Sequence, residues 1–325
     1  MPNKYLKPMI WIGLLAVVSV TLYLTFWLFG IDVITIGQLE RGLSRRASRI
    51  VAMIVVAITM GMTGLFFQTL TQNRILTPSV IGFDSTFVLS QTLIVFLFGS
   101  SSLLISNPYY NFVISTTVMV VSSLVLYGFV LKKGKNNLAL LLLVGLVFRT
   151  LMGSLTSFLS RIIDPDDFLV VTSRSMASLS NMNTDILWYL ALPIMVVVIV
   201  LMSRDTKSFD VMNLGEDQAK SLGVSYYKLM NRNLIYIAIL ISVSTALVGP
   251  LMFLGLITVN LARELLKTDY HKPLLWMSSM LGVVFLVLGQ FVLTTFNLNT
   301  SLAVLINLIG GLYMISILVK GDKKV

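Results

Sequence analysis

Few side chains in this 325-residue sequence could perform covalent or metal chemistry. It has one histidine, His271, and no cysteine, which excludes a cysteine nucleophile and a thiolate metal site. A transition-metal site would therefore need carboxylates, and Asp164, Asp166 and Asp167 are the candidates. They lie in an Asp-Pro-Asp-Asp run, which is typical of an acidic surface loop, so we predict no metal site.

Sequence motifs for nucleotide binding and hydrolysis are also missing. There is no G-x-x-x-x-G-K-[S/T] phosphate-binding loop and no H-E-x-x-H zinc motif. Serines are many, but the apolar segments hold no base that could activate one. We therefore predict that the chain is not an enzyme and has no cofactor.

The composition indicates the environment of these residues. Hydrophobic residues make up 56 % of the chain and charged residues 12 %, whereas a soluble domain is about 25 % charged. A soluble globule with so few charges could not cover its surface, which argues against a soluble enzyme or a nucleic-acid-binding protein. Because the apolar runs are continuous, a β-barrel with alternating strands is excluded. The sequence predicts an all-α integral membrane protein with one transmembrane domain over residues 1–325.

Ten apolar segments follow one another, and about 20 residues suffice for each membrane span. The segments cover residues 8–29, 48–70, 86–105, 110–131, 138–158, 186–203, 233–249, 254–266, 274–296 and 301–319. Most of the 24 Lys and Arg residues fall on the inner side if both termini are cytoplasmic. We therefore expect about ten transmembrane helices with an N-in, C-in topology. A basic cluster at residues 41–49 is the exception on the outer side.

Segments 2–5 and 7–10 form two similar blocks separated by one helix. In each block the second segment is short and follows a Gly/Pro-rich break, at Pro78 to Gly82 and at Gly249, Pro250 and Gly255. Paired interrupted segments are typical of inverted repeats that line a transport pathway. The alternative is that these residues are simply common in membrane helices. We predict an inverted repeat of helices 2–5 and 7–10.

The energy source of transport can also be inferred. Ion-coupled transporters usually carry acidic residues within their spans, and here only Asp84, at a segment edge, comes close. This absence argues against a secondary transporter driven by an ion gradient. We expect another protein to supply the energy.

The longest polar stretch, residues 203–232, is predicted to be a cytoplasmic coupling region. Asn213 and Glu216 have the spacing of a helix capping box, and Gly223 can adopt a left-handed conformation at a helix end. The stretch thus predicts a short helix that docks a soluble partner. The alternative is an amphipathic connector on the lipid surface.

At this point the sequence resembles the FecCD-type permease subunits of ABC importers for iron-siderophore and vitamin B12 uptake. The resemblance covers residues from about 40 to the C-terminus. It rests on four motifs in order, whose matching residues are Arg46 and Arg49; Gln68, Asn73, Pro78 and Gly82; Leu214 to Gly223; and Gly249, Pro250, Phe253, Gly255 and Leu256 followed by Ala262 and Arg263.

The resemblance implies roles for the first and third motifs. The third would contact the ATPase through Leu214, Gly215, Glu216, Ala219, Leu222 and Gly223. Arg46 and Arg49 would meet acidic residues of an extracellular solute-binding protein, and contact with lipid headgroups is the alternative. The implied partners are two ATP-binding subunits and a second permease chain, either a different paralogue or a second copy. The implied location is the cytoplasmic membrane of a bacterium, in contact with lipid and without nucleic acid.

Departures from the family pattern bear on the substrate. Val259-Asn260 replaces a common Pro-His pair, Asn73-Arg74-Ile75 replaces Asn-Pro-Leu, and Val292 lies where an arginine is often found. The runs at residues 163–168 and 183–185 look like the branch for catecholate siderophores, such as petrobactin or enterobactin. A ferric catecholate siderophore is the expected substrate, with another iron chelate, heme or cobalamin as the alternative.

Arg149 is a basic residue deep within the fifth segment. A charged residue at mid-membrane usually faces a cavity or a partner, and Gly153 and Ser157 follow it at helical spacing on one face. We predict that these three residues, with Gln68 and Asn73 of the second motif, line the translocation pathway. A structural pairing of Arg149 with a carbonyl or carboxylate of another helix is the alternative.

Overall fold

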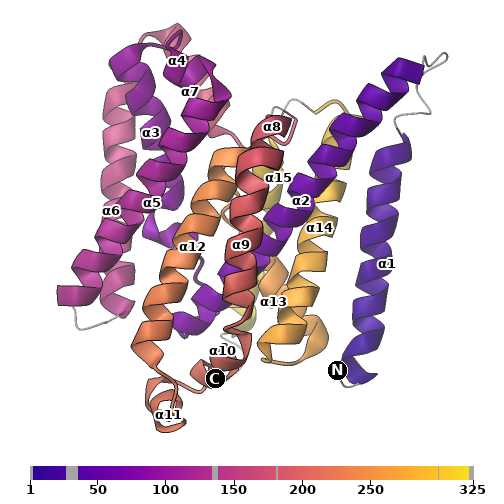
Figure 1. The fold of residues 1–325 in the computed structure, drawn as a ribbon, viewed down its shortest axis with the longest axis vertical. Helices are drawn as coiled ribbons and strands as arrows, with labels where there is room; N and C mark the ends of the chain where they lie inside the picture. Colours follow the sequence, from indigo (N-terminus) through magenta and orange to yellow (C-terminus); the bar gives the residue numbers. More distant parts are fainter. Residues whose placement is uncertain (1–2, 27–35, 134–137, 181, 299, 322–325) are drawn as a thin grey trace.

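The computed structural model describes residues 3–26, 36–133, 138–180, 182–298 and 300–321, which form helices and connecting turns with no strand (Figure 1). The long helices are α1 (Asn3–Thr25), α2 (Ile36–Leu70), α3 (Phe83–Phe98), α5 (Pro108–Lys133), α6 (Leu138–Ser160), α9 (Leu192–Ser203), α12 (Tyr226–Val248), α13 (Leu254–Leu266), α14 (His271–Thr295) and α15 (Leu302–Gly321). The short elements are η2 (Pro78–Ile81), α4 (Leu103–Ser106), α7 (Pro165–Ser175), α8 (Thr184–Ile186), a π-helical turn η3 (Leu187–Ala191), α10 (Thr206–Met212) and α11 (Glu216–Ser221).

The all-α prediction is confirmed, and each of the ten predicted apolar segments is largely helical where it is described. Segment 86–105 is divided between α3 and α4, and segment 186–203 between α8, η3 and α9. Among the described residues, seven helical stretches are long and apolar enough to cross a membrane: those of α1, α2, α5, α6, α8 to α9, α12 and α14. Helices α3 and α15 are shorter apolar helices, and α13 has 13 residues. Helices α2 and α12 begin well before their apolar segments, because polar residues continue each helix beyond its membrane stretch.

Helix α2 crosses the centre of the bundle at close range through small residues. A Cβ added at Gly64 would lie 3.3 Å from the backbone of Gly255, and a Cβ at Gly255 would lie 2.6 Å from the carbonyl oxygen of Met60. Gly61 meets Ser278 of α14 in the same way, at 2.8 Å. Small residues at helix contacts let the backbones approach closely, which increases van der Waals packing between membrane helices.

The Gly255 crossing gives a first prediction. Gly255→Val should lower the yield of folded protein severalfold, because overpacking a close contact costs about 1–3 kcal/mol. Gly128→Val is the matched control, since a Cβ at Gly128 would meet nothing within 4 Å. Size-exclusion chromatography of the detergent-extracted protein measures the yield. Equal yields of the two variants would contradict the crossing.

The two predicted repeats correspond to α2, α3, α5 and α6 and to α12, α13, α14 and α15. The first helix of each repeat packs against the second and third helices of the other repeat. Helix α2 packs against α13 and α14, while its counterpart α12 packs against α3 and α5. Helix α3 packs on α6 as α13 packs on α15. Both breaks also hold a glycine at positive φ, Gly82 before α3 (104°) and Gly249 after α12 (87°). This exchange is what an inverted repeat predicts.

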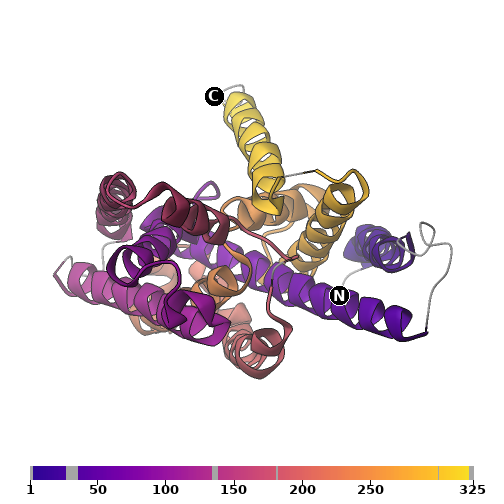
Figure 2. The same cartoon turned by 90° about the horizontal axis from the view of Figure 1, so that it is seen from above.

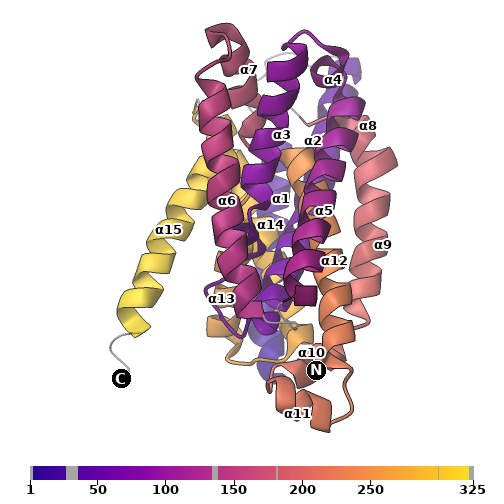
Figure 3. The same cartoon turned by 90° about the vertical axis from the view of Figure 1, so that its left-hand side faces the viewer.

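The two ends of the bundle differ in their short elements. Helices α10 and α11 lie at the same end as the start of α1 and the end of α15, while α4, α7 and α8 lie at the opposite end (Figures 1 and 3). Viewed from above, α15 projects away from the other helices (Figure 2). Residues 203–232, the predicted coupling region, therefore occupy the end that carries both termini.

Candidate coupling and transport sites

Helix α11 is present as predicted, but its first turn is built differently. The residue that caps it is Gly215, at a φ of 102°, whereas Asn213 ends α10. The predicted capping box of Asn213 and Glu216 is therefore wrong, because α10 continues through the position where the cap was expected. At the other end, Gly223 has a φ of 82°, as expected from its sequence position.

The end of α11 is closed by two backbone bonds. Gly223 N donates to the Lys220 carbonyl and Val224 N to the Ala219 carbonyl, each over 3.0 Å. This pair is the Schellman arrangement, which needs a left-handed residue and satisfies the last carbonyls of a helix. Helix α11 thus ends sharply at a defined point.

Polar contacts tie α11 to the start of α12. Lys220 Nζ donates to Glu216 Oε1 over 2.5 Å and lies 4.4 Å from the centre of the Tyr227 ring, and the Tyr227 hydroxyl donates to the same Glu216 oxygen. These hydrogen bonds, first that from Lys220 and then that from Tyr227, hold the pKa of Glu216 below its usual value. The negative charge of Glu216 is therefore already paired within this chain, where it links α11 to the start of α12.

The predicted docking residues divide into an exposed and a buried set. Leu214 is 58 % exposed and Leu222 is 64 % exposed, and they flank α11. Ala219 is fully buried in the chain's own core. Its small side chain lets α11 pack closely against the rest of this chain. The exposed apolar surface beside α11 is therefore formed by the two leucines.

A series of polar contacts, buried at His271 and Thr69 and partly exposed at Asp210, connects the coupling region to two long helices. His271 Nδ1 lies 2.7 Å from Asp210 Oδ1 of α10, which also accepts the His271 backbone N–H over 2.7 Å. Nε2 lies 2.8 Å from Thr69 Oγ1 of α2. Burial alone would raise the pKa of Asp210, but the side-chain and backbone hydrogen bonds from His271 outweigh it and lower that pKa.

This Asp210–His271–Thr69 chain has the residue types of a hydrolytic triad but not its accessibility. Thr69 is 2 % exposed and His271 1 %, and the imidazole packs edge-on against Phe66 and Phe209 at 5.8 Å. The Thr69 hydroxyl is also hydrogen-bonded to the Leu65 carbonyl at 3.1 Å. The arrangement links α10, α14 and α2 mechanically.

A second polar link joins the coupling region to α12. Asp205, which precedes α10, accepts hydrogen bonds from Arg232 and, over 2.8 Å, from Asn233 Nδ2. Asp205 is 6 % exposed, so both bonds lie at the edge of the core. Together with the His271 chain, they attach α10 to α2, α12 and α14, so displacement of α10 would move transmembrane helices.

The rim arginines bind backbone carbonyls of their own chain. Arg46 Nη1 donates to the Tyr23 carbonyl over 2.7 Å and the guanidinium lies 4.9 Å from the Tyr23 ring centre. Arg49 Nη2 donates to the Ser180 carbonyl over 3.1 Å. Both side chains are half-buried near the end opposite α10 and α11. These two hydrogen bonds join α1 and the loop after α7 to α2. The charges of Arg46 and Arg49 lie at the rim of the bundle, meaning the end opposite α10 and α11.

Arg149 lies on α6 beside the break before α3. A Cβ added at Gly82 would lie 3.2 Å from Arg149 Cα, so α6 passes closely over this turn. Asp84, at the start of α3 just after this turn, is 8 % exposed, and its Oδ2 has no hydrogen-bond partner among the described residues. No ion pair within 4 Å joins Arg149 and Asp84 among the described residues. The structure thus brings Arg149 near the one acidic residue that the sequence pointed out in a span.

The residues following Arg149 on its face lie at the surface of the chain. A Cβ at Gly153 would meet nothing within 4 Å, and Ser157 is exposed, with its hydroxyl bonded back to the Gly153 carbonyl over 3.0 Å. Arg149 itself is half-buried. This stripe therefore leaves α6 open along the side away from the core.

Comparison with known proteins identifies the family. The model of the FecCD transport family matches residues 9–320. The chain belongs to the FecCD transport family. It is 45 % identical to the petrobactin import system permease protein YclO of Bacillus subtilis (strain 168), over 95 % of this chain and 96 % of that one. It is 34 % identical to the petrobactin import system permease protein FatC of Bacillus anthracis, over 85 % and 78 %.

A solved structure has the same fold. An inward-facing metal-chelate type ABC transporter superposes on this FecCD chain with a TM-score of 0.83, covering 97 % of this chain and 99 % of the other at 21 % identity. The likeness thus extends over nearly the whole of the helical bundle described above.

Two FecCD motif residues that were predicted to line the pathway make polar contacts within this chain. Gln68 is 2 % exposed, and its Oε1 accepts a hydrogen bond from Arg263 over 2.7 Å. Arg263 also lies 3.8 Å from Asp269. This hydrogen bond links α2 to α13, and a role of Gln68 in the pathway stays a prediction. Asn73 is exposed and caps a turn, its Oδ1 accepting the Ile75 N–H over 2.9 Å.

Sequence reasoning missed the Asp210–His271–Thr69 chain in this FecCD protein. The available signal was the single histidine at the start of a predicted span and an aspartate within the predicted coupling region. What joins them is the packing of segments 61 and 202 residues apart, which no local pattern reports.

Proposed function

We propose that this chain is the permease subunit of an ATP-driven importer that moves a ferric siderophore, of the catecholate type, into a bacterial cytoplasm. The observation that carries the proposal is the 45 % identity, over nearly the whole of both chains, to a petrobactin import permease. The anchored helix α11, with its two exposed leucines, supports an energy source in a separate subunit. A secondary transporter would not need such a surface.

The proposed arrangement places α10 and α11 on the cytoplasmic side, where two ATP-binding subunits dock. ATP binding would move α11 and, through Asp210 and Asp205, bias α2, α12 and α14 between two states. A partner can shift such an equilibrium only by contacting the two states differently. The hydrogen bonds of Asp210 and Asp205 would transmit a change in ATPase contact from α10 to these helices.

A second permease chain would complete the pathway. Helices α6 and α15 expose large apolar side chains, among them Leu146, Val147 and Leu151 on α6 and Leu308 and Leu312 on α15. Between two such chains, Arg149, Gly153 and Ser157 would line a shared passage. A pore-facing cation suits an anionic ferric catecholate.

Substrate uptake in cells tests the proposal. A bacterium lacking its own siderophore permeases would express this chain with the second permease, ATPase and binding protein of its system. We expect saturable uptake of iron-55 supplied as ferric petrobactin and little uptake of a ferric hydroxamate. Preferential uptake of a ferric hydroxamate, heme or cobalamin would contradict the proposal that the substrate is a ferric catecholate siderophore.

Docking of the binding protein gives a second prediction. Arg46→Glu with Arg49→Glu should weaken binding of the solute-binding protein about tenfold and reduce its salt dependence, because rim charges steer association. Arg161→Glu with Arg174→Glu, two exposed arginines outside the motif, is the charge-matched control. Binding is measured by surface plasmon resonance at two salt concentrations. If both pairs behave like the unmodified chain, the rim arginines serve only to join helices.

A further inference from the structure

A large cleft opens on one side of α1, which packs along α14 elsewhere. It has a volume of about 1250 Å³ and is walled by α1, α2, the junction of α9 and α10, and α14. A pocket for a drug-sized ligand is about 300–1,000 Å³. The cleft lies outside α6, α11 and the rim arginines, so the function proposed above leaves it without an occupant.

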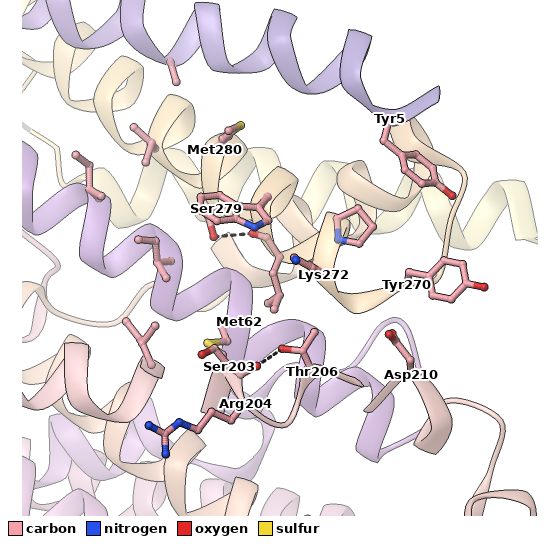
Figure 4. Close-up of a pocket in the computed structure, with 18 of the residues that line it drawn as sticks. Tyr5, Met62, Ser203, Arg204, Thr206, Asp210, Tyr270, Lys272, Ser279 and Met280 are labelled. Atoms are coloured by element: carbon pink, nitrogen blue, oxygen red, sulfur yellow. Dashed lines mark hydrogen bonds between the residues drawn. The ribbon is translucent and has the colours of Figure 1, made fainter. Parts of the chain in front are cut away.

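One end of the cleft is positively charged. Arg204 and Lys207, from the α9–α10 junction, and Lys272 of α14 line it. In Figure 4 the Lys272 side chain lies in the cleft and the Arg204 guanidinium points away from it. All three are exposed, and none makes an ion pair with another described residue. Among the described residues, one carboxylate lines the cleft, that of Asp210, which already accepts two hydrogen bonds from His271. This end therefore presents cations to an occupant.

The rest of the cleft is apolar and runs along the membrane stretch of the helices. On α14 its lining runs from Lys272 to Val283, which is about 16 Å of helix at about 1.5 Å per residue, and on α1 it comprises Tyr5 and the turn from Ala16 to Thr21. Ile54 and Met62 of α2 and Val283 of α14 continue the apolar wall. One leaflet of the hydrocarbon core is about 15 Å deep, half of about 30 Å. The groove is long enough for an acyl chain below a headgroup.

Aromatic residues gather at the charged end. Tyr5, Tyr270 and Trp276 line the cleft there, and Tyr270 and Trp276 are largely exposed. Tyr and Trp are enriched at the level of lipid headgroups. The aromatic and basic residues occupy the same end of the cleft, which indicates that this end lies at the membrane surface.

We propose that the cleft binds an anionic phospholipid of the leaflet on the α10 side. Lys207 and Lys272 would hold the phosphate, and the acyl chains would lie against α1, α2 and α14. Basic pockets between transmembrane helices recognise such headgroups. The bound lipid would fill the space between α1 and the body next to Asp210.

Lipid binding to the purified full chain tests this assignment. Native mass spectrometry counts bound phosphatidylglycerol and bound phosphatidylcholine with the same acyl chains, and thermal shift follows added inorganic phosphate. We expect retention of phosphatidylglycerol and no stabilisation by phosphate alone. Lys207→Gln with Lys272→Gln should weaken phosphatidylglycerol binding roughly tenfold or more. Lys228→Gln with Lys267→Gln, two exposed lysines outside the cleft, should leave it unchanged.

A second variant tests the apolar wall separately from the charges. Ser279→Trp places a large ring in the cleft and should reduce lipid binding while all three cations remain. Equal binding of both lipids would contradict headgroup recognition, and stabilisation by phosphate alone would indicate a free-anion site. Phosphatidylglycerol binding unaffected in both the lysine pair and Ser279→Trp would overturn the proposal.

Discussion

Leu214→Asp combined with Leu222→Asp should abolish transport while leaving the protein folded in the membrane. Both leucines are exposed beside α11, and burying one such side chain in an interface contributes about 1.5–3 kcal/mol. Replacing them with carboxylates should weaken ATPase docking at least a hundredfold, since each 1.4 kcal/mol is tenfold. Uptake of ferric petrobactin and co-purification of the ATPase measure the effect.

Two comparison variants locate the cause. Asn231→Asp adds a charge on an exposed position at the same end and should transport normally. Ala219→Asp should instead reduce the amount of folded protein, because Ala219 is fully buried in the chain itself. Normal ATPase docking and normal uptake by the double leucine variant would contradict the proposal that the leucines beside α11 form the docking surface.

Arg149→Leu should insert and assemble but transport an anionic ferric siderophore at least tenfold more slowly. The physical reason is that the variant removes the cation from the stripe formed with Gly153 and Ser157. Arg149→Lys keeps the charge and should retain a large part of the rate. Uptake rates at saturating binding protein, normalised to the amount of permease, measure the difference.

The same variant separates transport from a structural pairing with Asp84. If Arg149 serves to balance the buried Asp84 carboxylate, the double variant Arg149→Leu with Asp84→Asn should restore transport. If Arg149 faces the substrate, as we propose, the double variant should stay slow. Full transport by Arg149→Leu alone would contradict both roles.

The fold was largely predictable because its determinants are local. Continuous apolar runs located all ten segments, and glycines marked the left-handed positions at Gly82, Gly223 and Gly249. The helix limits were less predictable, since polar residues extend α2 and α12 outside the apolar runs. Asn213 could either end α10 or cap the start of α11, and the sequence did not distinguish the two. The predicted N-cap at Asn213 was therefore wrong.

The site was predictable only in part because its contacts join distant segments. The position of α11 followed from its motif, but the inward direction of Ala219 depends on packing against the rest of the chain. Gln68 meets Arg263 from 195 residues away, a contact that no local pattern predicts. The sequence pattern carries residue types and periodicity, whereas such pairs depend on the tertiary arrangement.

ATP-dependent uptake in proteoliposomes tests the central claim most directly. The vesicles would contain this chain, its second permease and the ATPase, with ferric petrobactin delivered by the binding protein on the outside and ATP enclosed. The account predicts accumulation of iron-55 that requires ATP and disappears with the double leucine variant. Accumulation driven by an imposed proton or sodium gradient without ATP would contradict it.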